Sequence, residues 1–407
     1  MGLCMKFVDL EVFEKRLKLL PLEDYIDLLE VTIRKWRTKP IVLSEGSPFT
    51  EEDSRVLNTL WSLGTKYVPV VEHEVDAEHE VSLDELDVFH NVRGDPVRVY
   101  ENVESLVSRD LPTPLVMLKS LSNSRVRVWA KLEWYHPFSL SIKDRIAWYM
   151  LVNALKTGRV SSGVIYEPTS ANTGLGLVGL ANYYGLKTRV YLPYTTQKCM
   201  DYIFATLGAE VVRKQVPITT AMINSVLQEA GRDGAVVLNQ FENDLNFIVH
   251  LKYTAKEIDY QLRSIKTTPN AVIGGLGTSG HVSAISVYFK NRYENVKIFA
   301  VQPSEESIIP GIRRVETGMK WIRIARIDKI IDVSLEEAFQ GIIHVAKKDG
   351  ILIGFSGGAV IHALNELISN GEVEGDVVAV IPDHGVKYIE LMQSILTKTC
   401  PDAPYTD

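Results

Sequence analysis

From residue 163 onward, short apolar runs rich in β-branched residues alternate with longer segments whose apolar residues recur at every third or fourth position. The short runs are typical of strands in a buried parallel sheet, and the longer segments predict crossover helices. The pattern therefore predicts an α/β fold. The predicted strands are GVIYE (163–167), KTRVYLP (187–193), AEVVR (209–213), AVVLN (235–239), NAVIGG (270–275), VKIFAV (296–301) and DVVAVIP (376–382).

The first 95 residues differ in composition, being acidic and rich in helical patterns. LPLEDYIDLLEVTIRKW (20–36) and SRVLNTLWSLG (54–64) predict two helices, as LGLVGLANYYG (175–185) and HVSAISVYFKNRY (281–293) do later in the chain. The stretch EVDAEHEVSLDEL (74–86) predicts loop and surface. We interpret residues 1–95 as a mainly helical N-terminal extension.

Bulk composition narrows the class of protein. The 407 residues are 46% hydrophobic and 23% charged, without an apolar run long enough for a membrane span. The N-terminus lacks the pattern of a secretory signal, so a cytoplasmic location is expected. A net charge of −7 with scattered Lys and Arg disfavours nucleic-acid binding. Three widely spaced cysteines, Cys4, Cys199 and Cys400, offer neither a disulfide framework nor a metal motif.

Three turns rich in glycine or serine each follow a strand-like run and open a predicted helix. They are TSANTGLG (169–176), GGLGTSGH (274–281) and FSGGA (355–359). In open α/β sheets, ligands bind at the carboxyl ends of the strands, where helix N-termini present unpaired N–H groups to anions. We therefore expect the three turns to face one cleft.

Lys143 lies near the start of a further predicted helix, IKDRIAWYMLVNAL (142–155), with Ser139 and Ser141 as candidate caps. The helix macrodipole and the like charge of Arg145 would both lower the pKa of this amine. A neutral amine is what a Schiff-base lysine requires. The alternative, commoner on local grounds, is a solvated lysine balanced by Asp144.

GGLGTSGH has the G-x-G-x-x-G spacing of a dinucleotide site, but the next strand ends in Gln302 and Pro303 and offers no acid for a ribose. The better interpretation is a phosphate site made by the N–H groups from Gly277 to His281 and the hydroxyls of Thr278 and Ser279. A strand-to-helix turn without a ligand remains the alternative.

TSANTG offers a second anion site, suited to a carboxylate. Thr169, Ser170 and Thr173 supply hydroxyls, and Asn172 supplies an amide. The same residues are favoured as helix caps, which is the alternative interpretation.

Ser356 and the pair Arg313 and Arg314 are the remaining candidates. A serine hydroxyl facing a pyridine nitrogen would temper the electron sink of a pyridoxal cofactor, although Ser356 could equally be a plain cap. Arginine binds phosphate bidentately, so the pair could hold a phosphate apart from the cofactor. Alternatively, Glu316 neutralises one of the two at the surface.

Taken in order, PFSLSIKDR, TSANTG, NQF, GGLGTSGH and FSGGA resemble the motifs of the fold-type II pyridoxal phosphate enzymes, which include cysteine synthase, cystathionine β-synthase and tryptophan synthase β. The likeness covers roughly residues 110 to 390. Within it, KLEWYHPFSLSIKDR and IPGIRRVETGMKW are similar to O-phosphoserine sulfhydrylases. The resemblance implies a homodimer whose subunit has two parallel-sheet lobes, 96–250 and 251–407, with the cofactor in the cleft.

Carried over by position, the resemblance implies a role for each candidate residue. Lys143 becomes the Schiff-base lysine and acid–base group. The other cofactor contacts are Asn172 at the 3′ oxygen, Gly277, Thr278, Ser279, Gly280 and His281 at the phosphate, and Ser356 at the pyridine nitrogen. The substrate contacts are Thr169, Ser170 and Gln240 at the carboxylate, Arg313 at the substrate phosphate, and Thr219 nearby.

The sequence departs from the family pattern at three positions. Ala171 stands where cysteine synthases commonly have Gly, and Ser279 and His281 replace Gly and Thr in the phosphate loop. His281 would either add charge to the phosphate site or face solvent at the helix start.

The implied reaction converts O-phospho-L-serine and sulfide into L-cysteine and phosphate through an aminoacrylate, with O-acetylserine as a further donor left open. Cystathionine β-synthase activity, from serine or O-acetylserine with homocysteine, is the enzymatic alternative. A catalytically silent protein that binds pyridoxal phosphate is the alternative from another class. A nicotinamide dehydrogenase is disfavoured by the missing ribose acid.

Overall fold

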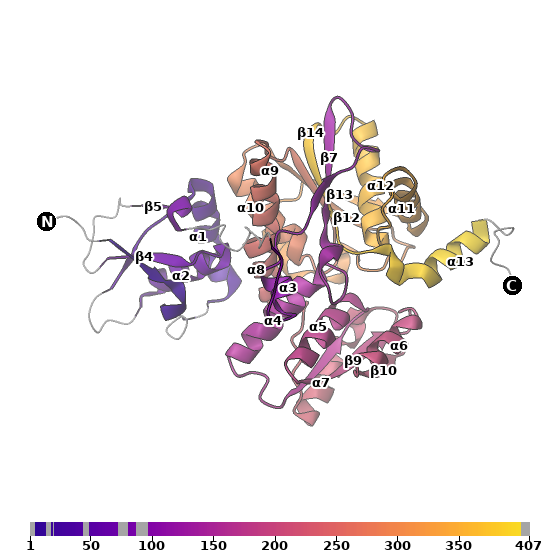
Figure 1. The fold of residues 1–407 in the computed structure, drawn as a ribbon, viewed down its shortest axis with the longest axis horizontal. Helices are drawn as coiled ribbons and strands as arrows, with labels where there is room; N and C mark the ends of the chain where they lie inside the picture. Colours follow the sequence, from indigo (N-terminus) through magenta and orange to yellow (C-terminus); the bar gives the residue numbers. More distant parts are fainter. Residues whose placement is uncertain are drawn as a thin grey trace.

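The computed structural model describes residues 5–13, 18, 20–43, 49–71, 80–86 and 97–399. They form a larger lobe, a smaller lobe and an N-terminal extension that lies against the larger lobe (Figure 1). Within these ranges, no helix combines the length and apolar composition needed to cross a membrane.

The larger lobe is built on a six-stranded sheet in the order β13-β12-β11-β14-β7-β6, in which only the edge strand β6 runs antiparallel. Its central strands are continuously apolar because helices cover both faces: α9 and α10 lie on one side, and α11 and α12 on the other (Figure 1). The strands are β6 (Leu115–Met117), β7 (Val126–Leu132), β11 (Ala271–Gly275), β12 (Lys297–Pro303), β13 (Lys329–Val333) and β14 (Gly375–Ile381). The helices are α8 (Leu245–Val249), α9 (Lys256–Ser264), α10 (Gly280–Arg292), α11 (Leu335–Lys348), α12 (Phe355–Ser369) and α13 (Ile389–Thr399).

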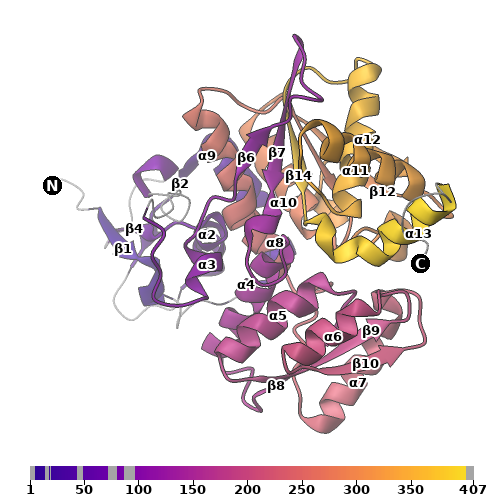
Figure 2. The same cartoon turned by 45° about the vertical axis from the view of Figure 1, so that its right-hand side comes forward.

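The smaller lobe has a parallel sheet in the order β10-β9-β8, which Figure 2 shows below the larger lobe. Helix α4 packs on α5 where the lobes meet. The elements of this lobe are α4 (Lys143–Lys156), β8 (Val164–Pro168), α5 (Asn172–Tyr183), β9 (Lys187–Pro193), α6 (Cys199–Thr206), β10 (Glu210–Lys214) and α7 (Ile223–Asp233).

Six of the seven predicted strands are confirmed, and the seventh, AVVLN, is wrong. Only Val236 makes a bridge, to Ile165 of β8, before the backbone turns at Asn239 with a φ of 52°. That left-handed turn leads the chain to the cleft and prevents the run from extending along β8.

The lobes do not divide at the predicted boundaries. β6 and β7 precede the smaller lobe in sequence, yet they belong to the larger sheet, where β7 pairs with β14 along its whole length. From β6 the chain therefore runs through the larger lobe, crosses to the smaller one at α4, and returns to the larger lobe at α8. The prediction missed this because charged residues alternate with apolar ones in β7, and Lys131 among them is buried only through ion pairing.

The extension contains the two predicted helices, α1 (Leu22–Lys35) and α2 (Glu51–Leu63), and is mainly helical as expected. It also contains a three-stranded sheet in the order β1-β4-β3 and the pair β2-β5. The strands are β1 (Lys6–Asp9), β2 (Arg37–Thr38), β3 (Ile41–Val42), β4 (Tyr67–Val71) and β5 (Val81–Ser82), and the short helix α3 (Ser105–Ser108) follows the extension.

Part of the stretch predicted as loop and surface is buried. Residues 74–79 lie outside the described residues, but β5 and the 3-10 turn after it are ordered, and Leu83 and Leu86 of that turn are fully buried. The prediction is wrong here because two apolar residues among acids are enough to anchor a short turn in the core. Cys4 and Cys400 also lie outside the described residues, and Cys199 is a free, half-buried thiol.

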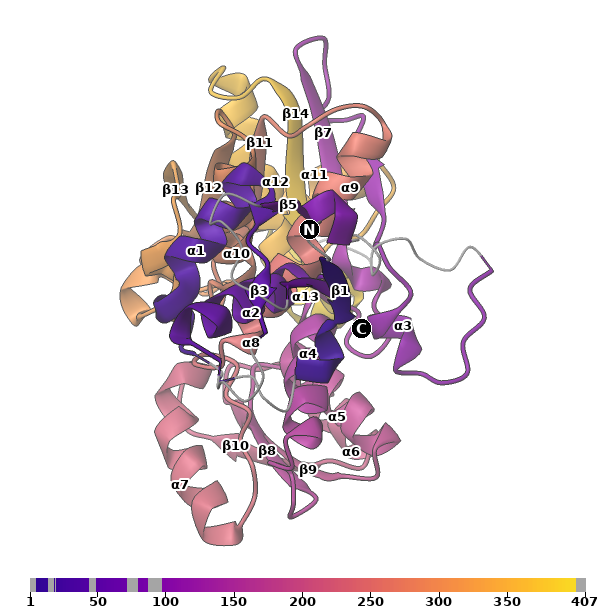
Figure 3. The ribbon, with the colours of Figure 1, turned by 90° about the vertical axis from the view of Figure 1, so that its left-hand side faces the viewer.

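The extension is attached to α10 by packing and polar contacts, and Figure 3 shows it facing the viewer. Trp36 packs edge-on against Tyr288 with ring centroids 6.3 Å apart, and the Arg292 guanidinium lies over the Trp36 ring. The ammonium of Lys256 donates a 2.7 Å hydrogen bond to the Leu63 carbonyl at the end of α2. Buried side chains of both parts form one continuous apolar cluster.

Candidate active site

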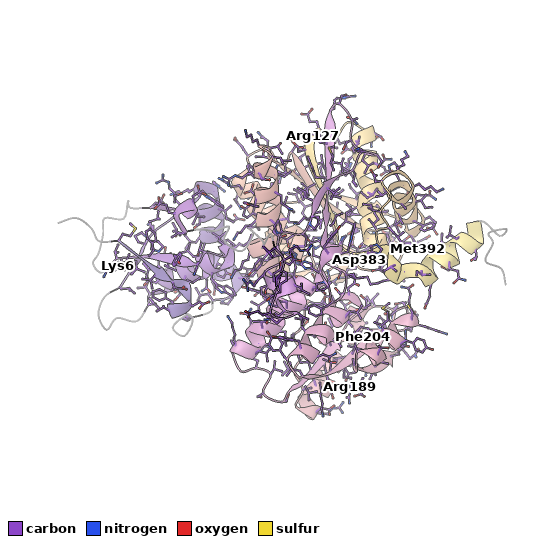
Figure 4. The ribbon with its side chains drawn as sticks, viewed as in Figure 1. Lys6, Arg127, Arg189, Phe204, Asp383 and Met392 are labelled. Atoms are coloured by element: carbon purple, nitrogen blue, oxygen red, sulfur yellow. The ribbon has the colours of Figure 1, made fainter. Side chains whose placement is uncertain are left out.

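A cavity of about 360 Å³ lies between the two lobes, and all three predicted turns contribute to its wall. It lies where β8, β11 and β14 end, which is the expected edge of parallel strands. In Figure 4, Arg127 near the start of β7 and Asp383 after β14 mark opposite ends of the larger sheet, and Asp383 lies where the lobes meet. The prediction that the turns share one cleft is confirmed.

Lys143 is the first residue of α4, and its half-buried side chain lines this cavity. The pKa of its amine is lowered to about 8, chiefly by burial and also by the nearby Lys387 ammonium, while the carboxylates of Asp383 and Glu133 act in the opposite direction. The predicted direction is confirmed. The predicted charge effect of Arg145 is not its cause, because that guanidinium is paired with Glu133 and with a second buried carboxylate.

Asp144 does not balance Lys143. Its carboxylate is buried and accepts hydrogen bonds from the backbone N–H groups of Phe138 and Ser139, at 2.8 and 2.9 Å. The solvated-lysine alternative is therefore wrong. Of the two candidate caps, only the Ser141 hydroxyl accepts from the Lys143 N–H, at 3.2 Å.

The predicted phosphate loop is a tight cradle at the start of α10. Gly277 and Thr278 line the cavity, whereas Ser279 and Gly280 are buried behind its surface. A side chain on Gly280 would collide with Asn246, since its Cβ would lie 2.2 Å from the Asn246 Oδ1. Within the described structure, the buried Ser279 hydroxyl has no hydrogen-bond partner. An unpaired buried hydroxyl beside a helix N-terminus fits an anion such as a phosphate group.

His281 lines the same cavity but is buried, so the solvent-facing alternative is wrong. Burial lowers the pKa of its imidazole to about 3, and the Lys143 ammonium adds to this effect. The ring is therefore neutral at pH 7 and adds no charge to the loop. It packs edge-on against His250, with ring centroids 5.8 Å apart.

Two interpretations were open for the TSANTG turn, an anion site and a helix cap, and each holds for some of its residues. Ser170 and Thr173 line the cavity, as a substrate-binding turn requires. Thr169 does not line it: its buried hydroxyl accepts hydrogen bonds from the N–H groups of Ala171 and Gly174, at 3.2 and 3.1 Å. Thr169 therefore caps α5, which was the alternative. Ala171 has a φ of 148°, a backbone region that favours glycine and explains the residue common in relatives.

Gln240 and Thr219 also line the cavity, from the smaller-lobe side. The Gln240 Oε1 accepts from the Thr173 hydroxyl at 2.8 Å, and its Nε2 donates to the buried Glu167 carboxyl at 3.1 Å. Burial raises the pKa of Glu167 to about 8. These contacts fix the Gln240 amide beside the turn that was predicted to bind a carboxylate.

Ser356 is the second residue of α12 and lines the cavity from the larger lobe. It is not the helix cap, a position occupied by Gly354. The plain-cap alternative for Ser356 is therefore wrong.

The two arginines have different surroundings. Arg314 pairs with Glu316 and Asp332, each at 3.0 Å, so the alternative of surface neutralisation is confirmed for this residue. Arg313 lies over the Phe241 ring, and its Nε donates to the Gly277 carbonyl at 2.8 Å. Among the described residues, no carboxylate lies within ion-pair distance of Arg313.

Sequence reasoning missed three residues at the site, Asp383, Lys387 and Tyr388, of which the first two lie near enough to affect the Lys143 amine. They follow β14 directly, and Lys387 and Tyr388 line the cavity. The position of PDHGVKY after the predicted strand DVVAVIP could have identified them, because carboxyl ends of parallel strands carry ligand contacts.

The site and fold define a pyridoxal phosphate enzyme of fold-type II. The family model described as "Pyridoxal-phosphate dependent enzyme" matches residues 108–383, so the chain belongs to this family and its cofactor is pyridoxal phosphate. When bound, this cofactor acts as an electron sink for chemistry at the α-carbon of an amino acid. The cavity fits it: a half-buried lysine, a phosphate-sized cradle and a hydroxyl lie around one space.

Within the family, the chain is similar to cysteine synthases. It is 32% identical to cysteine synthase B of Escherichia coli over 68% of this chain and 91% of that protein. It is also 32% identical to the cysteine synthase of Staphylococcus aureus, over 68% of this chain and 92% of that protein. The crystal structure of Entamoeba histolytica cysteine synthase matches with a TM-score of 0.64 and 26% identity, over 77% of this chain and 98% of that one.

The lowered pKa of Lys143 predicts how the apoprotein takes up pyridoxal phosphate. Only the neutral amine attacks an aldehyde, so the loading rate should rise with pH and level off above a midpoint of about 8. An unperturbed lysine would place that midpoint near pH 10. Stopped-flow absorbance after mixing apoprotein with cofactor between pH 6 and 10 measures it, and a midpoint near 10 would contradict the burial of the amine.

Proposed function

We propose that this chain is an O-phosphoserine sulfhydrylase, which converts O-phospho-L-serine and sulfide into L-cysteine and phosphate. The likeness to cysteine synthases supports the replacement of a leaving group on the β-carbon by sulfide. The choice of phosphoserine as donor is supported by the surroundings of one residue, Arg313.

Arg313 is a partly buried cation at a cavity wall, and the described part of the chain gives it no carboxylate partner. Its neighbour Arg314 has two such partners, which shows that acids are placed nearby and pair with the other residue. Two of the Arg313 donors are engaged, Nε by the Gly277 carbonyl and Nη1 by Thr317, and the Glu242 carboxylate acts on the guanidinium only from beyond ion-pair distance. A half-desolvated guanidinium in this setting favours binding of an anion through its remaining donors, and a phosphate monoester supplies such an anion. An acetyl ester would bring no charge to pair with it.

Each cavity residue would have a separate role in the proposed reaction. Ser170, Thr173 and Gln240 would orient the substrate carboxylate, so that the α-proton lies next to Lys143. The Lys143 amine would remove that proton and later return it, while Arg313 stabilises the negative charge that develops on the departing phosphate. The burial of the lysine favours this role, because it keeps the amine close to its neutral state near pH 8.

Arg313→Ala tests the choice of donor. We expect kcat/KM for phosphoserine to fall about 10- to 100-fold, the range of a lost charge-assisted hydrogen bond, and kcat/KM for O-acetylserine to change less than about threefold. The matched control is Arg314→Ala, which should leave both values within about threefold, because this guanidinium pairs with Glu316 and Asp332. Unchanged turnover of phosphoserine in Arg313→Ala would disprove the proposal.

A homodimeric assembly and a cytoplasmic location belong to the same proposal. The first follows from the resemblance to the family, and both stay predictions. Mass photometry or analytical ultracentrifugation of the full chain would establish the assembly.

A further inference from the structure

The cavity contains a second lysine, Lys387, in the short turn Gly385–Tyr388 that follows β14. Its side chain is only 8% exposed. A buried ammonium is costly unless its hydrogen bonds are satisfied. Its contacts therefore indicate what holds it in place.

The Lys387 ammonium joins three segments of the chain. It donates to the Ser139 carbonyl at 2.7 Å, in the loop before α4, and to the Asn172 Oδ1 at the start of α5. It also forms an ion pair with Asp383 at 3.5 Å. Both the loop that leads into Lys143 and the side chain of Asn172 thus depend on one cation.

Asp383 completes this arrangement from the other side. Its Oδ2 accepts a 2.8 Å hydrogen bond from the Asn172 Nδ2 and a short one from the Tyr388 hydroxyl. The Asn172 amide is therefore held at both ends, its oxygen by Lys387 and its nitrogen by Asp383. Only one orientation of the amide satisfies both contacts.

We propose that Lys387 and Asp383 are positioning residues, which clamp Asn172 and the loop before α4 and set the electrostatic potential at the Lys143 amine. This inference rests on the assignment of Lys143 as the cofactor lysine, and is independent of the choice of phosphoserine as donor. Both charges act on the Lys143 amine: the Lys387 ammonium lowers its pKa and the Asp383 carboxylate raises it. Removal of the cation and removal of the carboxylate should therefore shift that pKa in opposite directions.

The other titratable groups near the two residues keep their charge at pH 7. Burial lowers the pKa of His384, which lies beside both Asp383 and Lys387, so that imidazole is neutral. Glu133 is held by Arg145 in a buried ion pair, and burial lowers the pKa of both His281 and His250, so the two imidazoles are neutral at pH 7. Asp144, which faces Lys387, is held by backbone N–H groups. A shift of the loading midpoint in a variant of Lys387 or Asp383 can therefore be assigned to the loss of that side chain and its contacts, which we call the clamp.

The test is the pH profile of cofactor loading into the apoprotein, which uses no amino-acid substrate. Lys387→Met should move the midpoint upward by about one pH unit, because it removes a cation and leaves Asp383 without its ion-pair partner, and loading at pH 7 should become about tenfold slower. Asp383→Asn should move the midpoint downward. Lys387→Arg keeps the charge and should retain the midpoint of the unaltered protein.

Lys198→Met is the matched control, because this exposed lysine follows the cavity-lining Gln197 and makes no side-chain contact with the clamp. Its midpoint should be unchanged. Midpoints that do not move, or that move in the same direction in Lys387→Met and Asp383→Asn, overturn the inference. If Lys387→Met fails to fold, as judged by circular dichroism, the inference is tested by the other two variants. It then requires a lower midpoint in Asp383→Asn and an unchanged midpoint in Lys387→Arg. Loading that persists in Lys143→Ala would instead overturn the assignment of the cofactor lysine.

Discussion

Lys143→Ala will lose the visible absorbance of lysine-bound pyridoxal phosphate, and its turnover will fall by about a thousandfold or more. The residue combines a nucleophilic and an acid–base role in the proposed reaction, and loss of a general base alone costs about 10²- to 10⁴-fold. Absorbance spectra of the purified protein and steady-state cysteine formation measure the two effects separately.

Lys156→Ala is the matched control, because Lys156 is exposed at the other end of the same helix. It should keep both the absorbance and the turnover. A Lys143→Ala protein that retained the band would point to Lys387, the other lysine among the described residues that line the cavity. It would also contradict the proposed mechanism.

Arg145→Met will lower the free energy of unfolding by about 3–5 kcal/mol. Arg145 is buried and bonds two buried carboxylates, with its Nε 2.6 Å from Glu133 and its Nη2 2.7 Å from Glu257. Lys131 also donates to Glu257, at 2.8 Å. Loss of the guanidinium leaves Glu133 and Glu257 with one buried cation between them, and the remaining uncompensated charge is costly.

Urea denaturation monitored by circular dichroism measures this change. Arg159→Met, at an exposed position just after the same helix, should change the free energy of unfolding by less than about 0.5 kcal/mol. Adding Glu133→Gln to Arg145→Met should recover part of the loss, because it removes one of the unpaired charges. A loss below about 1 kcal/mol in Arg145→Met would show that water reaches the carboxylates.

Much of the fold could be predicted because its strands are continuous apolar runs and its helices are periodic. β11 and β14 are strands of the first kind, and α1 and α2 are helices of the second. β7 could not be placed, since a strand with alternating charges does not reveal that its lysine is paired inside the core with Glu257. Which sheet a strand joins depends on long-range pairing that a local pattern does not contain.

The candidate site was predictable to the level of turns, but not of individual side chains. Each turn reached the cavity, yet Thr169 uses its hydroxyl as a cap, and His281 is neutral because it is buried. Likewise, the sequence offers two adjacent arginines, and only the positions of Glu316 and Asp332 show which of the two is neutralised by ion pairs. Such distinctions depend on neighbours that are distant in sequence.

The N-terminal extension packs against α10 although it lies outside the segment that the family model matches. The family match begins at residue 108, but the apolar cluster that contains Leu29 and Ile33 of α1 also contains Tyr288 of α10. A fragment cut where homology begins would uncover that face of α10, the helix whose first turn forms the phosphate cradle. We therefore expect a fragment limited to the segment shared with relatives to be less stable than the full chain.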